Sequence, residues 1–437
     1  MIARYERVNR AQNISFRQLV PWIKVGERAT HYIHPYPAKL LPQIAHFFLS
    51  AQSLSKPGDV VLDPFGGSGT VALEAILAGR QAYYADANPL AQLIARVKTT
   101  PVDERLIEEA YFQIGKKYRR YKSIKGYEPS VVNLKYWYAP QSIEKLCLIK
   151  RAIESVTDTK IKNFLLISFS AVCRKVSFAD PRLSVPVRQK ALLELGGDNL
   201  PDVWGEFANQ ISNNLKRMER LTSLRMHFSK TSYIGNDARN LRQPTSDFKL
   251  HTKKLAANSV DIIITSPPYA GAQKYIRASS LSLGWLGLAN ASDLKPLENA
   301  SIGREHFPKI TCAECPNTGL QVVDRLIKKI FKVNPLRSVI VATYIIEMDA
   351  AIKEMARVLK PDGHLVLVIG NNEVCGLPFK SSEYLALICE KYGLSLKLKL
   401  IDEIKSRGLM TKRNKTASVI TREWVLLFEK PKSMKAL

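Results

Sequence analysis

The chain has 437 residues, 46% of them hydrophobic and 24% charged, which exceeds one typical core and excludes a disordered chain. This length predicts either two domains or one large domain with a substantial insertion. The formal charge of +26 and the isoelectric point of about 9.7 favour a polyanionic partner. Nucleic acid is the usual one, because lysine and arginine displace its counterions, although a solvated basic surface is the alternative.

The sequence predicts a cytoplasmic protein without a membrane anchor. Residues 1–10 lack the apolar segment of a signal peptide, and no apolar run has the length of a membrane span. Six cysteines scattered through so long a chain indicate reduced thiols. Cys312 and Cys315 form a single CxxC pair without a second pair, so we expect no metal site there.

The first informative segment is His31-Tyr-Ile-His-Pro-Tyr-Pro-Ala-Lys39, which precedes a helical pattern at residues 40–49. Its prolines give the chain a stiff entry into the helix, and its aromatic and histidine side chains could line a pocket. An ordinary helix start explains the same pattern.

A strand, a glycine-rich turn and a helix follow. Residues 59–63 read as the strand, Asp63-Pro-Phe-Gly-Gly-Ser-Gly-Thr70 as the turn, and residues 71–77 as the helix. Glycines at such a turn let the backbone approach a bound nucleoside closely. The turn is not GxGxxG and has no following Lys-Ser/Thr, so pyrophosphate binding is not indicated.

A second strand, residues 81–85, ends at Asp86 and is followed by Asn88. An acidic residue at this place in a strand–turn–helix–strand unit is positioned to accept hydrogen bonds from both ribose hydroxyls. Alternatively, Asp86 only caps the next helix.

Residues 100–230 are mostly helical by pattern, with helices at 142–156, 161–176 and 205–224. Their basic residues suit phosphates, and the tyrosines between them suit unstacked bases, although a solvated helix face fits equally well. A later basic segment, residues 404–415, joins two expected strands. The candidate nucleic-acid contacts are Lys116, Lys117, Arg119, Arg120, Arg174, Arg182, Lys412 and Arg413.

The apolar strand at residues 260–264 runs into Thr265-Ser-Pro-Pro-Tyr269. Two prolines cannot continue the strand, so its end is a rigid loop. The Ser266 hydroxyl and the backbone carbonyls near Pro267 could accept hydrogen bonds there, with the Tyr269 ring as a stacking face. This arrangement suits a planar base with an exocyclic amine, and an ordinary proline turn is the alternative.

The C-terminal part completes the fold. It predicts a helix at 350–359, a turn at 361–363 and strands at 364–369, 394–400 and 418–429. Together with a strand at 231–234, about seven strands alternate with helices. The fold class is therefore α/β, a doubly wound sheet with a mostly helical insertion.

The glycine turn resembles the FxGxG cofactor motif of S-adenosylmethionine-dependent DNA amino-methyltransferases, and residues 265–269 resemble their catalytic motif, (D/N/S)-P-P-(Y/F). The resemblance implies a Rossmann-like catalytic domain at 1–99 and 231–437, with a target-recognition region at 100–230. It implies that the cofactor lies among His34, Tyr36, Asp63, Phe65, Gly67, Gly69, Thr70, Asp86, Asn88 and Asp237. Catalysis is assigned by the same resemblance to Ser266, Pro267, Pro268 and Tyr269.

Cytosine C5 methylation requires a cysteine nucleophile after a proline, and the chain has no Pro-Cys pair. Serine before the prolines resembles the N4-cytosine enzymes, whereas the N6-adenine enzymes, the second possibility, more often carry Asp or Asn. We therefore expect base flipping and methylation of duplex DNA by a monomer or dimer, with a companion restriction endonuclease possible. An RNA base methyltransferase and a non-catalytic DNA-binding subunit are two further possibilities.

Overall fold

The computed structural model describes residues 1–24, 26–37, 39–121, 128–189, 201–224, 230–243, 253–271, 274–308, 312–404 and 420–432. Within these residues the core is an eight-stranded sheet of order β1-β9-β10-β6-β5-β2-β3-β4. The strands are β1 Gln12–Ile14, β2 Val60–Asp63, β3 Gln81–Tyr84, β4 Thr231–Tyr233, β5 Val260–Thr265, β6 Leu359–Ile369, β9 Ser395–Glu403 and β10 Arg422–Glu429. Only β10 runs antiparallel to its neighbours β6 and β9, which confirms the doubly wound α/β class.

Alternate residues of the central strands face two separate apolar layers. Val61 and Ile262 pack into one layer, whereas Leu62 and Ile263 pack into the other. The first layer contains α3 Pro42–Ser50, α4 Thr70–Leu77 and α5 Pro89–Thr99. The second contains α14 Gln321–Val333, α15 Pro335–Val358 and α16 Ser381–Lys391. Because helices cover both faces, the strands read as nearly continuous apolar runs in the sequence.

Two features of the sheet differ from the prediction. The edge strand β1, which pairs in parallel with β9 from Gln12 opposite Leu400, was not expected, because three residues are too few for a recognisable pattern. The predicted turn at residues 361–363 is wrong, since these residues belong to β6. Asp362, at φ 60°, donates its backbone N–H to Lys430, and Lys430 donates its own to Gly363, so pairing with the adjacent chain continues through the irregularity.

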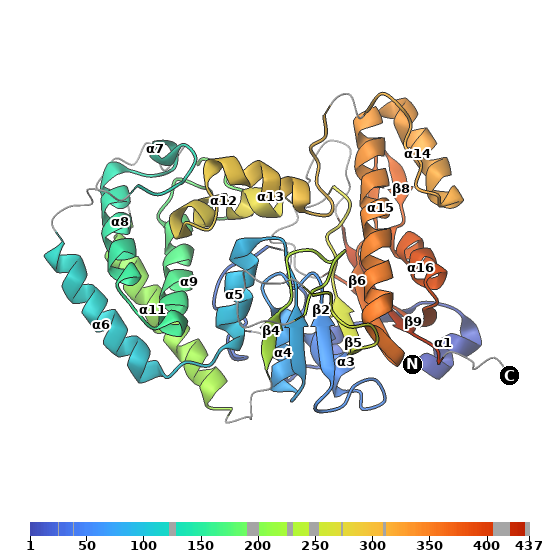
Figure 1. Cartoon of the computed structure of the whole chain (residues 1–437), viewed down its shortest axis with the longest axis horizontal. Helices are drawn as coiled ribbons and strands as arrows, with labels where there is room; N and C mark the ends of the chain where they lie inside the picture. Colours follow the sequence, from blue (N-terminus) through green and yellow to red (C-terminus); the bar gives the residue numbers. More distant parts are fainter. Residues whose placement is uncertain are drawn as a thin grey trace.

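The helices of residues 100–230 lie together beyond α5, on one side of the sheet (Figure 1). They are α6 Glu104–Arg120, α7 Leu134–Trp137, α8 Pro140–Glu154, α9 Thr159–Lys175 and α11 Val203–Thr222, and we refer to them as the helical group. Helix α9 packs against α5 and against α12 Tyr275–Leu286. The helical group therefore shares its apolar core with the first layer of the sheet.

Shorter elements complete the described chain. They are α1 Ile2–Val8, α2 Phe16–Leu19, the 3₁₀ turn η2 Ala291–Asp293, α13 Leu294–Ala300 and the hairpin β7 Asn372–Val374 with β8 Leu377–Phe379. Helices α12 and α13 lie between the helical group and the upper end of the sheet (Figure 1). None of the described helices combines the length and apolarity needed to cross a membrane.

Candidate active site

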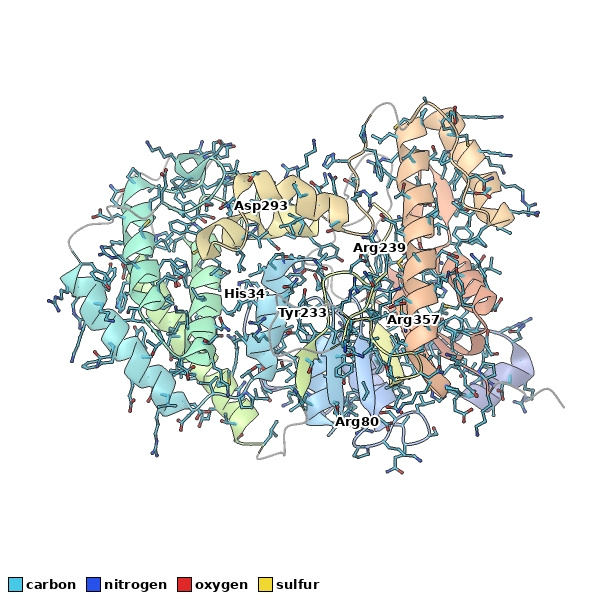
Figure 2. All side chains as sticks on the ribbon, in the orientation of Figure 1. His34, Arg80, Tyr233, Arg239, Asp293 and Arg357 are labelled. Atoms are coloured by element: carbon cyan, nitrogen blue, oxygen red, sulfur yellow. The ribbon has the colours of Figure 1, made fainter. Side chains whose placement is uncertain are left out.

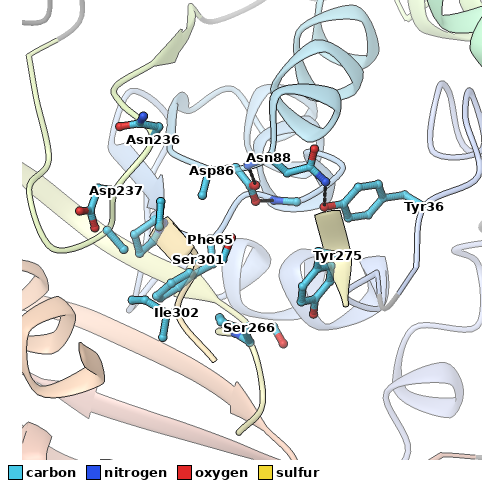
Figure 3. A pocket seen from close by; sticks show the side chains of 16 residues that line it. Tyr36, Phe65, Asp86, Asn88, Asn236, Asp237, Ser266, Tyr275, Ser301 and Ile302 are labelled. Carbon is cyan, nitrogen blue, oxygen red and sulfur yellow. Dashed lines mark hydrogen bonds between the residues drawn. The ribbon is translucent and has the colours of Figure 1, made fainter. Parts of the chain in front are cut away.

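A pocket of about 680 Å³ lies at the carboxyl ends of four parallel strands. Phe65 follows β2, Asp86 follows β3, Asp237 follows β4 and Ser266 follows β5, and all four line the pocket. Carboxyl ends of parallel strands share one edge of a sheet, which explains how residues 65 and 266 come together. Figure 3 shows Asp237 at one side of the pocket, Asp86 and Asn88 at the centre and Tyr36 at the other side.

The glycine turn needs its glycines for two different reasons. Gly67 has φ 49°, lines the pocket and donates its backbone N–H to Asp86 Oδ2 at 2.8 Å. Gly69 has φ 74°, and a Cβ atom there would lie 2.8 Å from Ala95 Cα on α5. Gly67 therefore forms the pocket wall, whereas Gly69 lets α4 pack closely on α5.

Two hydrogen bonds hold the Asp86 carboxylate in place, and they leave some of its lone pairs for other donors. Oδ2 accepts from Gly67, and Oδ1 accepts from the backbone N–H of Asn88 at 2.8 Å. A carboxylate offers about four lone-pair positions, so two are left for donors in the pocket, such as a pair of ribose hydroxyls. Burial raises the pKa of Asp86 to about 6, partly offset by its two backbone hydrogen bonds.

This raised pKa predicts a pH-dependent affinity for S-adenosylmethionine. If Asp86 holds the ribose, as the sequence predicts, the hydroxyls donate to the ionised carboxylate, and protonation of Asp86 as the pH falls through about 6 weakens that acceptor. Affinity should stay level from pH 8 to 7 and then weaken roughly tenfold per unit below pH 6. Calorimetry across this range tests the expectation, and an equally steep fall in Asp86→Asn would assign the pH dependence to another group.

Asn88 organises the wall beside Asp86. Its side-chain oxygen accepts the Leu90 N–H at the start of α5, and its Nδ2 donates to the Tyr36 hydroxyl at 3.3 Å and to Ser279 Oγ at 2.9 Å. Tyr36 in turn stacks on Tyr275, with ring centroids 6.4 Å apart and planes 18° apart. Asn88 thus joins the N-terminal segment to α12 and shapes the pocket through Tyr36.

The opposite wall is held by Arg239. Its Nε donates to Asp237 Oδ1 at 2.8 Å, one terminal nitrogen donates to Glu347 on α15 at 3.0 Å, and the other donates to the Ala300 carbonyl at 3.0 Å. Asp237 Oδ1 also accepts the Arg239 N–H, and no described residue bonds to its Oδ2. That oxygen remains available at the pocket, near the apolar side chains of Phe65 and Ile302.

The loop after β5 is fixed by a buried carboxyl group. Thr265 Oγ1 donates to Asp63 Oδ1 at 2.6 Å, and the Phe65 N–H donates to the same oxygen at 3.1 Å. Burial raises the pKa of Asp63 to about 7. Asp63 therefore joins the ends of β2 and β5 directly below the pocket, and the pocket itself is lined by Ser266 and Pro268.

Tyr269 follows Pro268 in the chain, and its hydroxyl group makes a hydrogen bond. The hydroxyl donates to Glu423 Oε1 on β10 at 3.0 Å. Burial raises the pKa of Tyr269 and that of Glu423, so both groups are held neutral more readily than in water. A Cβ atom on Gly370 would lie 3.0 Å from Tyr269 Cε2, so glycine at the end of β6 makes room for the ring.

Glu423 is expected to position Tyr269, and a double-mutant cycle tests this. Glu423→Ala and Tyr269→Phe each remove the same hydrogen bond, so each should lower the methyl-transfer rate by a similar, modest factor. The double variant should be no slower than either single one, and Glu423→Gln, which keeps an acceptor, should restore most of the rate. Additive losses in the double variant would show that Glu423 acts independently of the Tyr269 hydroxyl.

Some predicted cofactor residues lie outside the pocket. Gly69 and Thr70 are buried at the start of α4. His34 lies toward the helical group, whereas Arg239 lies beside α15 (Figure 2). One His34 ring nitrogen bonds to the Pro35 carbonyl at 2.6 Å and the other to Ser170 on α9 at 3.0 Å. Burial lowers the pKa of His34 to about 3, so the neutral ring joins the N-terminal segment to the helical group.

The predicted nucleic-acid residues are dispersed. Lys116, Lys117, Arg119 and Arg120 lie on α6, at the outer side of the helical group (Figure 1). Arg174 donates to the carbonyl groups of Asp180 and Leu183 and lines a second cavity next to His34. Arg182 is exposed and paired with Asp180. Lys412 and Arg413 lie outside the described residues.

The sequence did not indicate several side chains of the pocket, among them Asn236, Tyr275, Ser301 and Ile302. Asn236 directly precedes the predicted Asp237, so its place after a strand was a usable signal. Tyr275, Ser301 and Ile302 come from segments that reach the pocket only through the packing of α12 and α13, and their local sequence gives no signal.

Residues 9–96 match the model of the DNA methylase family. The chain is 26% identical over 411 residues to the type II methyltransferase M.MvaI of Kocuria varians, a match that covers 89% of this chain and 87% of that protein. It is 23% identical over 299 residues to the type II methyltransferase M.BsoBI of Geobacillus stearothermophilus, which covers 62% of this chain and 55% of that protein.

Among solved structures, a SAM-dependent methyltransferase from Methanosarcina mazei is 11% identical, covering 91% of this chain and 99% of that one. Its TM-score is 0.31, which is a distant likeness. The family match and the two relatives, together with the motifs at the strand ends, support an S-adenosylmethionine-dependent DNA amino-methyltransferase of restriction-modification type, which is what this chain resembles.

Proposed function

We propose that this chain transfers a methyl group to the N4 amine of a cytosine flipped out of duplex DNA. The observation that carries the proposal is the presence of Ser266 and Pro268 in the same pocket as Asp86 and Asp237. Acceptors for a base amine and acceptors for a nucleoside cofactor thus share one space. The preference for cytosine over adenine rests on serine at position 266 and on the resemblance of this motif to N4-cytosine enzymes.

The pocket residues fit S-adenosylmethionine. The free lone pairs of Asp86 suit ribose hydroxyls, and the free Asp237 Oδ2 suits the amino group of an adenine held between Phe65 and Ile302. The faces of Tyr36 and Tyr275 suit a sulfonium, because aromatic rings attract cations. When bound, S-adenosylmethionine supplies an electrophilic methyl group.

The proposed transfer requires that the base amine is oriented toward the methyl group. It requires no covalent bond between the enzyme and the base. The lone pair of the cytosine amine is delocalised into the ring, so Ser266 and the Pro267 carbonyl accept hydrogen bonds from the amine and direct its nitrogen toward the methyl group. Tyr269 provides the surface on which the flipped base stacks. The amine nitrogen would gain one N–C bond and release one proton to solvent, and the bound cofactor would supply the methyl group from its S–C bond and leave as a neutral thioether.

The proposal also divides the chain into a catalytic domain and a target-recognition region. Residues 1–99 and 231–437 form the catalytic domain, and residues 100–230 form the target-recognition region, although the two share a core in the described structure. A companion endonuclease that cleaves the same site unmethylated is part of the proposal.

Transfer of a labelled methyl group from S-adenosylmethionine to duplex DNA and to tRNA tests the proposed activity. We expect label in duplex DNA and background levels in tRNA. Label in tRNA alone would make the chain an RNA methyltransferase. Cofactor binding without any transfer would make it a non-catalytic DNA-binding subunit.

A further inference from the structure

A groove of about 1320 Å³ borders the pocket. The start of α12 and the end of α13 separate the two spaces, because Tyr275 and Ala300 line the pocket while Arg277 and Asn299 line the groove. On its other side the groove is lined by Trp137 at the end of α7. The groove therefore runs from the pocket toward the helical group.

Two exposed cations, Arg277 and Lys295, line the groove. Neither has an ion-pair partner among the residues that the structure describes. Glu298 is the acidic residue in the lining, and its carboxylate lies 3.6 Å from His306 Nε2. Free cations beside an amide such as Asn299 favour an anionic ligand with hydrogen-bond acceptors.

The wall at α7 adds one aromatic side chain, that of Trp137. Trp137 is half-buried and contacts Tyr136 edge to face, with ring centroids 4.9 Å apart. Arg188 lies over the Tyr136 ring at 4.4 Å, and neither of these two residues lines the groove itself. The Trp137 ring together with the cations Arg277 and Lys295 suits a nucleic-acid strand, since rings stack on bases and cations neutralise phosphates.

We propose that this groove holds the DNA strand that flanks the flipped cytosine; the proposal rests on the proposed function. A flipped base stays covalently attached to its neighbours, which lie about 3.4 Å apart along each strand of the duplex. Arg277 lies two residues after Tyr275, about 3 Å further along α12 and about 200° around it, so Tyr275 faces the pocket while Arg277 faces the groove. A strand that delivers a base to the pocket therefore has to cross the first turn of α12 to reach Arg277. The basic run on α6 has no comparable connection to the pocket (Figure 1).

The test is the salt dependence of duplex binding by an Arg277→Ala, Lys295→Ala double variant. We expect weaker binding and a log–log slope flatter by about 0.9 for each phosphate that the variant no longer neutralises. The KM for DNA should rise, whereas kcat and the affinity for S-adenosylmethionine should change little. The matched control is Lys328→Ala, Lys329→Ala on α14, which removes the same charge from two exposed lysines away from the groove (Figure 1).

An unchanged slope and unchanged KM in the groove variant, or an equal change in the α14 control, would overturn the inference. Thermal melting confirms that the variant is folded, and an Arg277→Gln, Lys295→Gln pair replaces it if alanine impairs folding. Failure of this inference is distinguishable from failure of the proposed function. The wild-type chain would still methylate duplex DNA in the first case and would not in the second.

Discussion

Tyr269→Ala is expected to lower methyl transfer by roughly 5- to 150-fold, because a flipped base loses about 1–3 kcal/mol of stacking on the aromatic ring. The ring is fixed on two sides, by the hydrogen bond from its hydroxyl to Glu423 and by the close approach of Gly370. Steady-state kinetics with duplex DNA measures the loss. A Tyr269→Ala enzyme as fast as the wild type would remove the ring from the base site.

Two substitutions separate the functions of the loop. Tyr269→Phe keeps the ring and loses only the bond to Glu423, so it should retain most activity. The raised pKa of Glu423 supports this expectation, because a carboxyl group that protonates easily tolerates the loss of its donor. Ser266→Ala should slow the reaction without abolishing it, since the Pro267 carbonyl remains as an acceptor.

Asp86→Ala is expected to weaken S-adenosylmethionine binding by about 1.5–3 kcal/mol, or roughly 10- to 150-fold, the range for hydrogen bonds to a charged group. The carboxylate also accepts the N–H groups of Gly67 and Asn88, so its loss removes support from the turn as well as the ribose acceptors. Calorimetry gives the affinity directly.

Asp86→Asn is the matched control, because it keeps the shape of the side chain and one acceptor oxygen. It should fall between the wild type and the alanine variant, and duplex DNA binding should stay largely intact in both. Unchanged cofactor affinity in Asp86→Ala would place the ribose elsewhere.

The central strands could be predicted because each is a short apolar run that ends in a distinctive turn. Phe65, Gly67, Asp86 and Ser266 come within four residues of the ends of such strands, and the parallel sheet brings them to one edge without further information. Their pocket positions therefore followed from local sequence and one topological rule.

Other parts of the pocket depend on packing that local sequence does not specify. Asp63 was expected beside the cofactor, but its buried carboxyl group holds Thr265 below the pocket. Tyr275 enters the pocket beside Tyr36 and Ser279, which Asn88 joins; the contact from Asn88 to Ser279 spans 191 residues of chain, and no periodicity predicts it. The same limit applies to α6, whose basic run is clear in the sequence but lies on the outer side of the helical group (Figure 1).

Mass spectrometry of nucleosides from duplex DNA methylated by this chain tests the central claim most directly. The account predicts N4-methylcytosine, together with no covalent complex on DNA that contains 5-fluorocytosine. N6-methyladenine would change the target base but keep the mechanism of amine transfer. 5-Methylcytosine would contradict both the target and the mechanism.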